Sequence, residues 1–238
     1  MRAGTATEGG ADSVTRAQER EQLARGCAAL GVDLDASALE RLLALIDALE
    51  LANARFNLTA IRDRPGMLRK HVLDSLTLQP YLAGESLADV GTGAGFPGLP
   101  LAIVNPRRRF ALIESIGKKA RFVESTARAL GCANVEVIAE RAERYRPAAP
   151  FDRVTSRALG PLAGFVEQAR HLCAPGGRLL AMKGKRPDAE IEALPPTVRV
   201  LAVHRVAVPG LDDERHIVEL SPVGESTGCV RRSSRARP

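Results

Sequence analysis

Four glycines within eight residues form the segment of the chain with the clearest chemical meaning. Residues 87–98 read LADVGTGAGFPG, after a short apolar strand and before an expected helix. Glycines lack a Cβ atom, so a ligand can approach the backbone, and they adopt positive φ values without strain. In an open α/β sheet such a loop lies beyond the carboxyl ends of the strands, where ligands bind. We therefore expect a ligand site that includes Gly91, Gly93 and Gly95.

Two classes of ligand fit this loop. Residues 93–98 match the dinucleotide fingerprint G-x-G-x-x-G. Asp89 ends the strand just before the first glycine, however, and a carboxylate there disfavours a diphosphate but tolerates the sulfonium and ammonium groups of S-adenosylmethionine. Glu114, at the end of the next strand, is placed to bind ribose hydroxyls, which both ligands carry. Asp89 and the C-terminal strand pair favour S-adenosylmethionine; the dinucleotide is the alternative.

The elements that must position the loop alternate between strands and helices. We expect strands at 86–90, 109–114, 135–139, 151–156 and 178–183, with helices around 99–104, 118–130 and 161–172. This alternation predicts an α/β, doubly wound, mostly parallel sheet with helices on both faces. Two more strands, 198–208 and 215–220, are joined by a turn with Pro209 and Gly210. They predict an antiparallel pair at one edge of the sheet.

Three helices are expected before the sheet. Leu23, Cys27 and Leu30 recur at helical spacing, and residues 37–40, SALE, form a capping box that would open a second helix. A third, at 67–79, would stop at Pro80. The predicted organisation is a disordered leader at 1–15, an N-terminal helical extension at 16–83 that packs on the core, the cofactor-binding core at 84–220, and a disordered basic tail at 221–238.

Composition excludes several classes of protein. The chain has 238 residues, 45% hydrophobic and 26% charged, which is typical of a globular protein. Its four cysteines are far apart and form no C-x-x-C pair, so we expect reduced thiols and no metal site. No apolar run reaches the ~18 residues of a membrane span, and the N-terminus lacks a secretory signal, which predicts a cytoplasmic protein without a membrane partner. The net charge of +6 permits a polyanionic partner.

Several motifs, taken as a set, resemble the RsmG family, also called GidB. They are NLTAIRD at 57–63, HVLDS at 71–75, DVGTGAGFPG at 89–98, GKK at 117–119, SRA at 156–158, LAMKG at 180–184 and RHIV at 215–218. The resemblance runs from about residue 20 to 220. It implies a class I, Rossmann-like methyltransferase that transfers a methyl group from S-adenosylmethionine to N7 of a guanine in bacterial 16S ribosomal RNA.

The resemblance also implies site residues. The family's cofactor contacts fall on Gly91, Phe96, Ala142, Glu143 and Arg157, and Glu114 matches the family's acidic position. Together with Asp89, Gly93, Gly95 and Ser115, these residues make up the expected cofactor site. Asn57, His71 and Asp74 match motifs that line the same cleft and, with Arg157, are candidates for the acceptor side. The aromatic-rich stretch that often precedes NLT is here LANARF, so stacking there rests on Phe56 alone.

Structural roles are open alternatives for the acceptor candidates. Arg157 either contacts a ligand or forms a salt bridge with a nearby acid such as Asp152 or Glu143. His71 and Asp74, three residues apart on one helix, either form a buried hydrogen bond or help to close the cleft. Asn57 either contacts a ligand or holds its own loop through its side-chain amide.

The chemistry requires no general base, because guanine N7 already carries a lone pair, and we assign none. Lys118, Lys119 and Arg121 open a helix, where cations are unfavourable, which makes phosphate contact plausible. Lys183 and Lys185 are further RNA-binding candidates. The expected partner is 16S ribosomal RNA or the small ribosomal subunit, bound by a monomer. The alternatives are a methyltransferase acting on a small molecule or a protein, and a non-catalytic RNA-binding ribosome-assembly factor.

Overall fold

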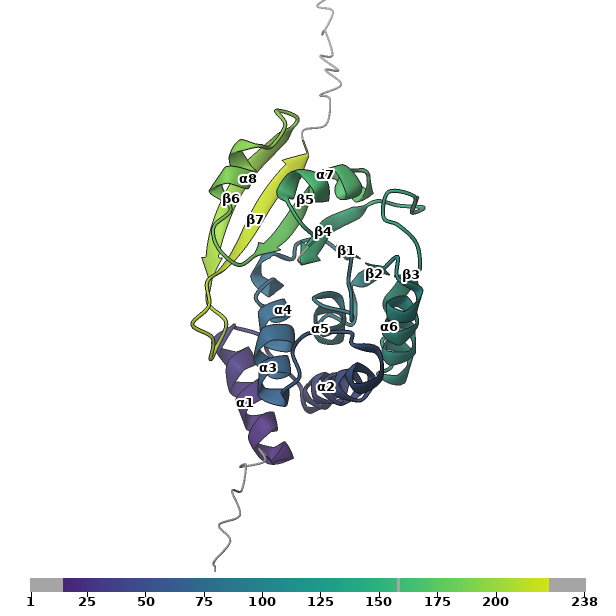
Figure 1. Ribbon diagram of the computed structural model, residues 1–238, viewed down its shortest axis with the longest axis vertical. Helices are drawn as coiled ribbons and strands as arrows, with labels where there is room; N and C mark the ends of the chain where they lie inside the picture. The colour runs from purple at the N-terminus through teal and green to yellow at the C-terminus, as the bar shows by residue number, and fades with distance from the viewer. Residues whose placement is uncertain (1–14, 158, 223–238) are drawn as a thin grey trace, which may run out of the picture.

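The computed structural model describes residues 15–157 and 159–222. Within them, seven strands form one sheet in the order β3-β2-β1-β4-β5-β7-β6 (Figure 1). The strands are β1 (Ser86–Val90), β2 (Arg109–Ile113), β3 (Val135–Ile138), β4 (Phe151–Arg157), β5 (Cys173–Lys183), β6 (Val198–Val206) and β7 (Arg215–Pro222). Strand β7 is antiparallel to both of its neighbours, and the other pairs are parallel. The doubly wound sheet predicted from the sequence is confirmed.

The burial of each strand agrees with its central or edge position in the sheet. All five residues of β1 are buried, as expected for a central parallel strand that is covered on both faces. Strand β6, at the edge, has no buried residue. Strand β1 lies between β2 and β4, with Asp89 opposite Leu112 and Thr155. The carboxyl ends of these three strands therefore meet at the loop that follows β1.

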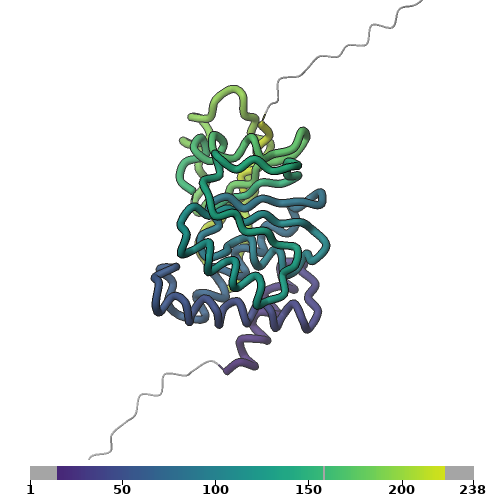
Figure 2. Tube along the Cα trace, turned by 90° about the vertical axis from the view of Figure 1, so that its right-hand side faces the viewer, coloured from purple at the N-terminus to yellow at the C-terminus, as the bar shows by residue number. Residues whose placement is uncertain are grey.

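Two hydrophobic cores cover the two faces of the sheet. Leu87 belongs to one core and its neighbour Ala88 to the other, because successive strand residues point to opposite faces. The first core also takes in the N-terminal helices, α5 (Gly98–Val104) and α6 (Gly117–Ala129), and the second contains α7 (Leu162–Ala169). In the edge view of Figure 2, the N-terminal helices, in purple and blue, lie at one end of the molecule and the C-terminal strands at the other.

The N-terminal helices begin at positions that differ from the prediction. After α1 (Arg16–Ala29), helix α2 (Ala36–Phe56) is capped by Asp35, whose carboxylate accepts from the Ala38 N–H at 2.6 Å. The capping box expected at 37–40 is therefore wrong, because Asp35 provides a better acceptor two residues earlier. A capping box does occur at the start of α1, between Thr15 and Gln18.

The third predicted helix is also more complex than expected. It begins at Arg64, where the Asp63 carboxylate accepts from the Gly66 N–H at 2.7 Å. It consists of α3 (Arg64–Met67), a π-helical turn (Leu68–Leu73) and α4 (Asp74–Leu76). A 3₁₀ turn (Gln79–Tyr81) follows and contains Pro80, so the α-helix ends before the predicted residue 79.

The remaining differences lie in the C-terminal half. Strand β5 begins at Cys173 rather than at 178, and an unpredicted short helix, α8 (Asp188–Glu192), follows it. Strand β7 includes residues 221 and 222, which were expected in the tail. The rest of the expected tail, 223–238, and residues 1–14 of the expected leader lie outside the described residues. Among the helices that the structure describes, none has the length and apolar character needed to span a membrane.

The N-cap of α2 can be tested by two alanine substitutions. We expect Asp35→Ala to lower the free energy of unfolding by about 1 kcal/mol, because the Ala38 N–H loses its acceptor. Ser37→Ala, the control, should change it by less than about 0.5 kcal/mol, because Ser37 is an exposed helical residue. Urea unfolding followed by circular dichroism measures both; a larger loss for the Ser37 variant would restore the capping box.

Candidate functional site

The loop after β1 is fixed by a carboxylate that lies beneath it. Asp89 is fully buried, and its Oδ2 atom accepts from Thr92 Oγ1 at 2.6 Å and from the Gly98 N–H at 2.9 Å. Gly91, Gly93 and Gly95 have φ values of 69°, 64° and 90°, a region that other residues adopt only with strain. Gly98 serves close packing, because a Cβ atom there would lie 2.1 Å from Leu112 Cδ2. Asp89 and the glycines together define the shape of the loop.

The second oxygen of Asp89 is unusual. Its Oδ1 atom is buried and has no hydrogen-bond partner among the described residues. Burial raises the pKa of this carboxyl from 3.8 to about 6, although the bonds from Thr92 and Gly98 act in the opposite direction. A carboxylate that is incompletely paired favours a cationic neighbour over an anionic one. Asp89 thus fits a ligand that carries an ammonium or sulfonium group.

Glu114 connects the glycine loop to the segment after β2. Its Oε2 atom accepts from the Gly93 N–H at 2.9 Å and its Oε1 atom accepts from the Ile116 N–H at 2.8 Å. Only 5% of Glu114 is exposed. Each carboxylate oxygen keeps a further lone pair, so the group can still accept from a ligand hydroxyl.

A narrow cavity lies beside this loop. It has a volume of about 70 Å³, and four of the expected cofactor residues line it: Gly91, Ser115, Ala142 and Glu143. Leu159 lines the same cavity and packs against the loop, because a Cβ atom at Gly91 would lie 2.7 Å from Leu159 Cδ1. Pockets for small molecules measure roughly 300–1,000 Å³. This cavity is therefore smaller than a typical small-molecule pocket.

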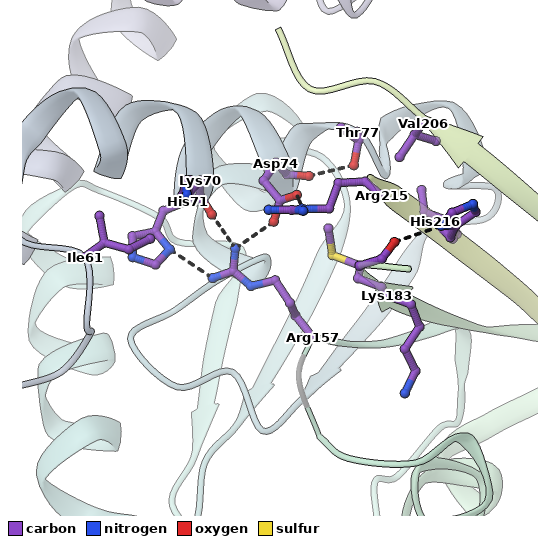
Figure 3. A pocket seen from close by; sticks show the side chains of 13 residues that line it. Ile61, Lys70, His71, Asp74, Thr77, Arg157, Lys183, Val206, Arg215 and His216 are labelled. Carbon is purple, nitrogen blue, oxygen red and sulfur yellow. Dashed lines mark hydrogen bonds and ion pairs between the residues drawn. The ribbon is translucent and has the colours of Figure 1, made fainter. Parts of the chain in front are cut away.

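A larger cavity, of about 550 Å³, lies at the carboxyl ends of β4 and β5 (Figure 3). His71 and Asp74 reach it from the helical segment 68–76, Arg157 from the end of β4, and Arg215 from the start of β7. The structure thus brings three of the four acceptor candidates together. Arg157, which was expected at the cofactor as well, lines this cavity and not the smaller one.

The buried carboxylate of Asp74 binds two arginines at once. Its Oδ2 atom lies 3.1 Å from Arg157 Nη1, and its Oδ1 atom lies 2.9 Å from Arg215 Nε. Arg157 Nη1 also donates to the Lys70 carbonyl at 3.0 Å. Arg157 does form a salt bridge, as one alternative predicted, but its partner is Asp74 and not Asp152 or Glu143. Asp152 instead accepts from Ser86 at the start of β1.

The direct hydrogen bond expected between His71 and Asp74 is absent from the described contacts. Both side chains point toward Arg157 instead (Figure 3). The π-helical turn, which ends just before Asp74, changes the angular spacing of side chains from that of an α-helix. A pairing rule for residues three apart in an α-helix therefore does not apply.

The hydrogen bonds of His71 fix its protonation. Arg157 Nη2 lies 3.2 Å from His71 Nδ1, and because a guanidinium only donates, Nδ1 must accept. The ring proton is therefore on Nε2, which donates to Thr59 Oγ1 at 2.9 Å. Burial, aided by the charge of Arg157, lowers the pKa of His71 to about 3. The neutral ring stacks on Phe96 with its centroid 4.8 Å away.

Asn57 does not line either cavity. It is exposed, caps the end of α2 with a φ of 49°, and accepts from Arg62 Nη2 at 3.3 Å. Its side-chain amide therefore bonds within its own loop, as one of the two predicted alternatives requires. The buried Asn53 adds a second amide contact to this loop, because it accepts from the Thr59 N–H at 2.9 Å.

The basic residues expected to contact RNA separate into two groups. Lys118 and Arg121 are exposed on the first turns of α6, and Lys119 is half-buried beside them. Lys183 forms an ion pair with Glu190 at 2.7 Å and donates to the Gly160 carbonyl at 2.6 Å, so its charge is compensated. Lys185 is exposed and forms no ion pair with a described residue.

The sequence analysis assigned no role to two residues at or near the larger cavity. Arg215 was part of the RHIV motif but received no role, although it holds Asp74. Thr59 was part of NLTAIRD and fixes the tautomer of His71. Membership of a motif was the only signal in either case.

In residues 15–157 and 159–222, no group of three or more His, Cys, Asp or Glu side chains could hold a metal ion.

Comparisons with known proteins match this arrangement. The family model described as rRNA small subunit methyltransferase G matches residues 38–218. The ribosomal RNA small subunit methyltransferase G of Nitrosococcus oceani is 46% identical over 200 residues, which cover 84% of this chain and 94% of that protein. The protein of the same name from Xanthomonas campestris pv. campestris is 48% identical over 196 residues, covering 82% and 92%.

Two solved structures support the fold. The O-methyltransferase TomG of Streptomyces achromogenes aligns with a TM-score of 0.53 and 20% identity, covering 83% of this chain and 94% of TomG. The glycopeptide N-methyltransferase MtfA, solved with S-adenosylmethionine, aligns with a TM-score of 0.55 and 11% identity, covering 63% and 93%. The expected class I methyltransferase fold is thereby confirmed.

The raised pKa of Asp89 predicts a pH dependence of stability. The folded state binds the Asp89 proton more tightly than the unfolded chain, so this stabilisation is complete below pH 3.8 and is lost as the pH rises through about 6. Each tenfold change in proton affinity corresponds to ~1.4 kcal/mol. From acidic pH to pH 7, the free energy of unfolding of the wild type should therefore fall by roughly 3 kcal/mol more than that of the Asp89→Asn variant. Urea unfolding of both proteins at pH 3.5, 5 and 7 measures the difference. If the difference in free energy of unfolding between the two proteins did not change with pH, Asp89 would not be a buried group with a raised pKa.

The shared carboxylate predicts unequal effects of two substitutions. Asp74→Asn leaves the largely buried Arg157 without a carboxylate partner and Arg215 with only the exposed Asp213 at 3.7 Å, and we expect a loss of roughly 3 kcal/mol in the free energy of unfolding. Arg157→Ala leaves Asp74 paired with Arg215, so the loss should be about 1–2 kcal/mol. Chemical unfolding compares the two variants. Equal losses would mean that Arg215 does not compensate Asp74.

Proposed function

Because the chain belongs to the rRNA small subunit methyltransferase G family, we propose that it transfers the methyl group of S-adenosylmethionine to N7 of a guanine in 16S ribosomal RNA. The observation that carries this proposal is the span of the family match. Residues 38–218 include the glycine loop, Glu114 and all the side chains that converge on Asp74. The match therefore covers both the cofactor side and the acceptor side of the site.

The cofactor would bind between the glycine loop and the segment 140–143. When bound, S-adenosylmethionine supplies a methyl group on a positively charged sulfur. Gly91, Ser115, Ala142 and Glu143 border the cavity, and Glu114 is the acceptor for ribose hydroxyls. The unpaired Oδ1 atom of Asp89 supports a cationic ligand in preference to a diphosphate.

Catalysis in this proposal depends on position rather than on proton transfer. Guanine N7 has a lone pair and no proton to lose, so a new N7–carbon bond can form as the carbon–sulfur bond breaks, and the positive charge moves to the purine. Alignment of the reacting atoms can contribute ~7–11 kcal/mol to such a step. His71 is unsuited to be a base, because its pKa is about 3 and both ring nitrogens are occupied.

The 550 Å³ cavity is the proposed site of the guanine. Arg157 and Arg215 line it as hydrogen-bond donors, and the guanine edge offers O6 as an acceptor beside N7. A donor on O6 orients the base and leaves the N7 lone pair free for the methyl group. Three cations, Arg157, Arg215 and Lys70, lie against two carboxylates, Asp74 and Asp213, so this group keeps a net positive charge that suits an RNA strand.

The partner in this proposal is 16S ribosomal RNA, free or in the small ribosomal subunit, and the protein acts as a monomer in the cytoplasm. Exposed Lys118, Arg121 and Lys185 are the proposed phosphate contacts. Lys183 is a weaker candidate, because Glu190 compensates its charge.

A labelling experiment tests the acceptor. The protein and methyl-labelled S-adenosylmethionine are incubated with small ribosomal subunits, free 16S RNA, and transfer RNA as the control. We expect label at guanine N7 in 16S RNA, in the free RNA, the subunit or both, and none in transfer RNA. Label confined to transfer RNA or to protein would overturn the proposed acceptor. Calorimetric titration with S-adenosylmethionine tests the alternative of a non-catalytic assembly factor. That alternative predicts that the protein binds RNA but gives no heat of binding with S-adenosylmethionine.

A further inference from the structure

A second concave surface lies between α2 and α6, away from both cavities of the proposed active site. Figure 1 shows the two helices side by side. The hollow between them has a volume of about 500 Å³. We call it the α2–α6 groove, and its principal lining residues are Leu51, Arg55 and Phe56 of α2 and Lys118, Arg121 and Phe122 of α6.

Large apolar side chains are exposed at this groove. Leu51 is 68% exposed and Phe56 50%, and Ile116, 46% exposed, stands just before α6. Among the described residues only one other large hydrophobic side chain, Leu201, is classed as exposed. Two of these four residues, Leu51 and Phe56, therefore line the groove, and Ile116 is two residues from Lys118, which lines it as well. A cluster of this kind on a folded protein marks an interaction surface.

The charges at the groove have one sign. Arg55, Lys118 and Arg121 line it, and no acidic side chain among the described residues does. None of the three cations forms an ion pair with a described residue; Lys118 Nζ donates only to the Phe56 carbonyl at 3.3 Å. Lys118 lies in the first turn of α6, which has no acidic residue there and no side-chain cap. Because a helix N-terminus is itself positive, this region favours an anion.

An exposed aromatic ring, Phe56, among uncompensated cations is the chemistry that binds single-stranded nucleic acid. Unstacked bases pack on aromatic faces, and the cations contact the phosphates. We propose that the α2–α6 groove binds a single-stranded segment of the RNA substrate, with an unpaired base stacked on Phe56 and phosphates at Arg55 and Arg121. This inference rests on the proposed function, because it takes the substrate to be RNA.

Two short segments of chain link the groove to residues of the proposed active site. Phe56 is three residues from Thr59, whose hydroxyl accepts from His71 in the acceptor cavity. Ile116 follows Glu114 by two residues and donates its N–H to the Glu114 carboxylate. Short stretches of chain thus join the proposed RNA groove to residues on both sides of the proposed active site.

Charge argues against two other occupants. The C-terminal residues 223–238 contain four arginines and one glutamate, so they carry the same sign as the groove. In a symmetric dimer the same patch meets itself, which would bring Arg55, Lys118 and Arg121 against their own copies. An RNA strand has the opposite charge and planar bases that can stack on the exposed ring of Phe56.

The test measures binding of the full-length protein to a 16S ribosomal RNA transcript over a range of salt concentrations. We expect Phe56→Ala to raise the Kd at least about fivefold without changing the salt slope, because a stacking partner is lost but no charge. Phe56→Trp should retain near-normal affinity. Arg55→Ala combined with Arg121→Ala should reduce the slope by up to about 1.4, at ~0.7 per phosphate contact on a single strand.

Matched controls lie outside the groove. Leu201→Ala removes an exposed apolar side chain on β6, and Arg128→Ala removes a cation further along α6. Both should bind the RNA within twofold of wild type. All variants should keep the thermal stability and S-adenosylmethionine affinity of the wild type, and Phe56→Ala should raise the KM for RNA with little change in kcat.

Three outcomes decide between the possibilities. If Phe56→Ala and the double arginine variant bind RNA as the wild type does while the wild type methylates 16S RNA, the groove assignment is wrong and the proposed function stands. If wild type binds RNA through the groove but labels no 16S RNA, the groove is supported and the proposed acceptor fails. A wild-type dimer that Phe56→Ala converts to a monomer, seen by light scattering, would overturn the RNA assignment in favour of self-association.

Discussion

The carboxylate of Asp74 holds together the three parts of the chain that form the acceptor cavity. It is buried in the helical segment 68–76, and it binds Arg157 at the end of β4 and Arg215 at the start of β7. Removal of a buried charge from such a set costs several kcal/mol, because its partners stay desolvated. The position of the helical segment over the sheet and the position of Arg157 beside His71 and Phe96 both depend on this interaction.

The proposed reaction benefits from a site that holds the reacting groups rigidly. A base that needs no deprotonation gains most from a site in which the donor and acceptor are held in line. Three buried carboxylates provide that rigidity by binding backbone N–H groups or arginines: Asp89 under the glycine loop, Glu114 between the loop and the segment after β2, and Asp74 at the cavity. His71 acts as a spacer in this arrangement, since its neutral ring joins Phe96, Thr59 and Arg157.

The segment after α2 links the two surfaces for which we propose RNA contact. Phe56 stands at the groove, and three residues later Thr59 contacts His71 at the acceptor cavity. Asn53, buried within α2, fixes this segment through the Thr59 N–H. The position of the exposed ring is thus coupled, through a short and hydrogen-bonded stretch of chain, to the cavity where the guanine would bind.

The sequence by itself determined the sheet, the glycine loop and the class of cofactor. These features depend on local patterns: alternating strands and helices, glycines at positions that need positive φ, and an acid at the end of a strand. The family motifs added the reaction. Element boundaries were less accurate, as the caps at Asp35 and Asp63 and the early start of β5 show, because competing local signals lie only a few residues apart.

Only the tertiary structure decided which side chains pair. Asp74 is 83 residues from Arg157 and 141 from Arg215, and a pairing rule for neighbours on one helix selected His71 instead. Packing between distant segments likewise decides the π-helical turn and the proximity of Phe56 to Arg121. The sequence indicated His71, Asp74 and Arg157 but gave no role to Arg215, because the contacts among these residues follow from long-range geometry, which a local pattern does not encode.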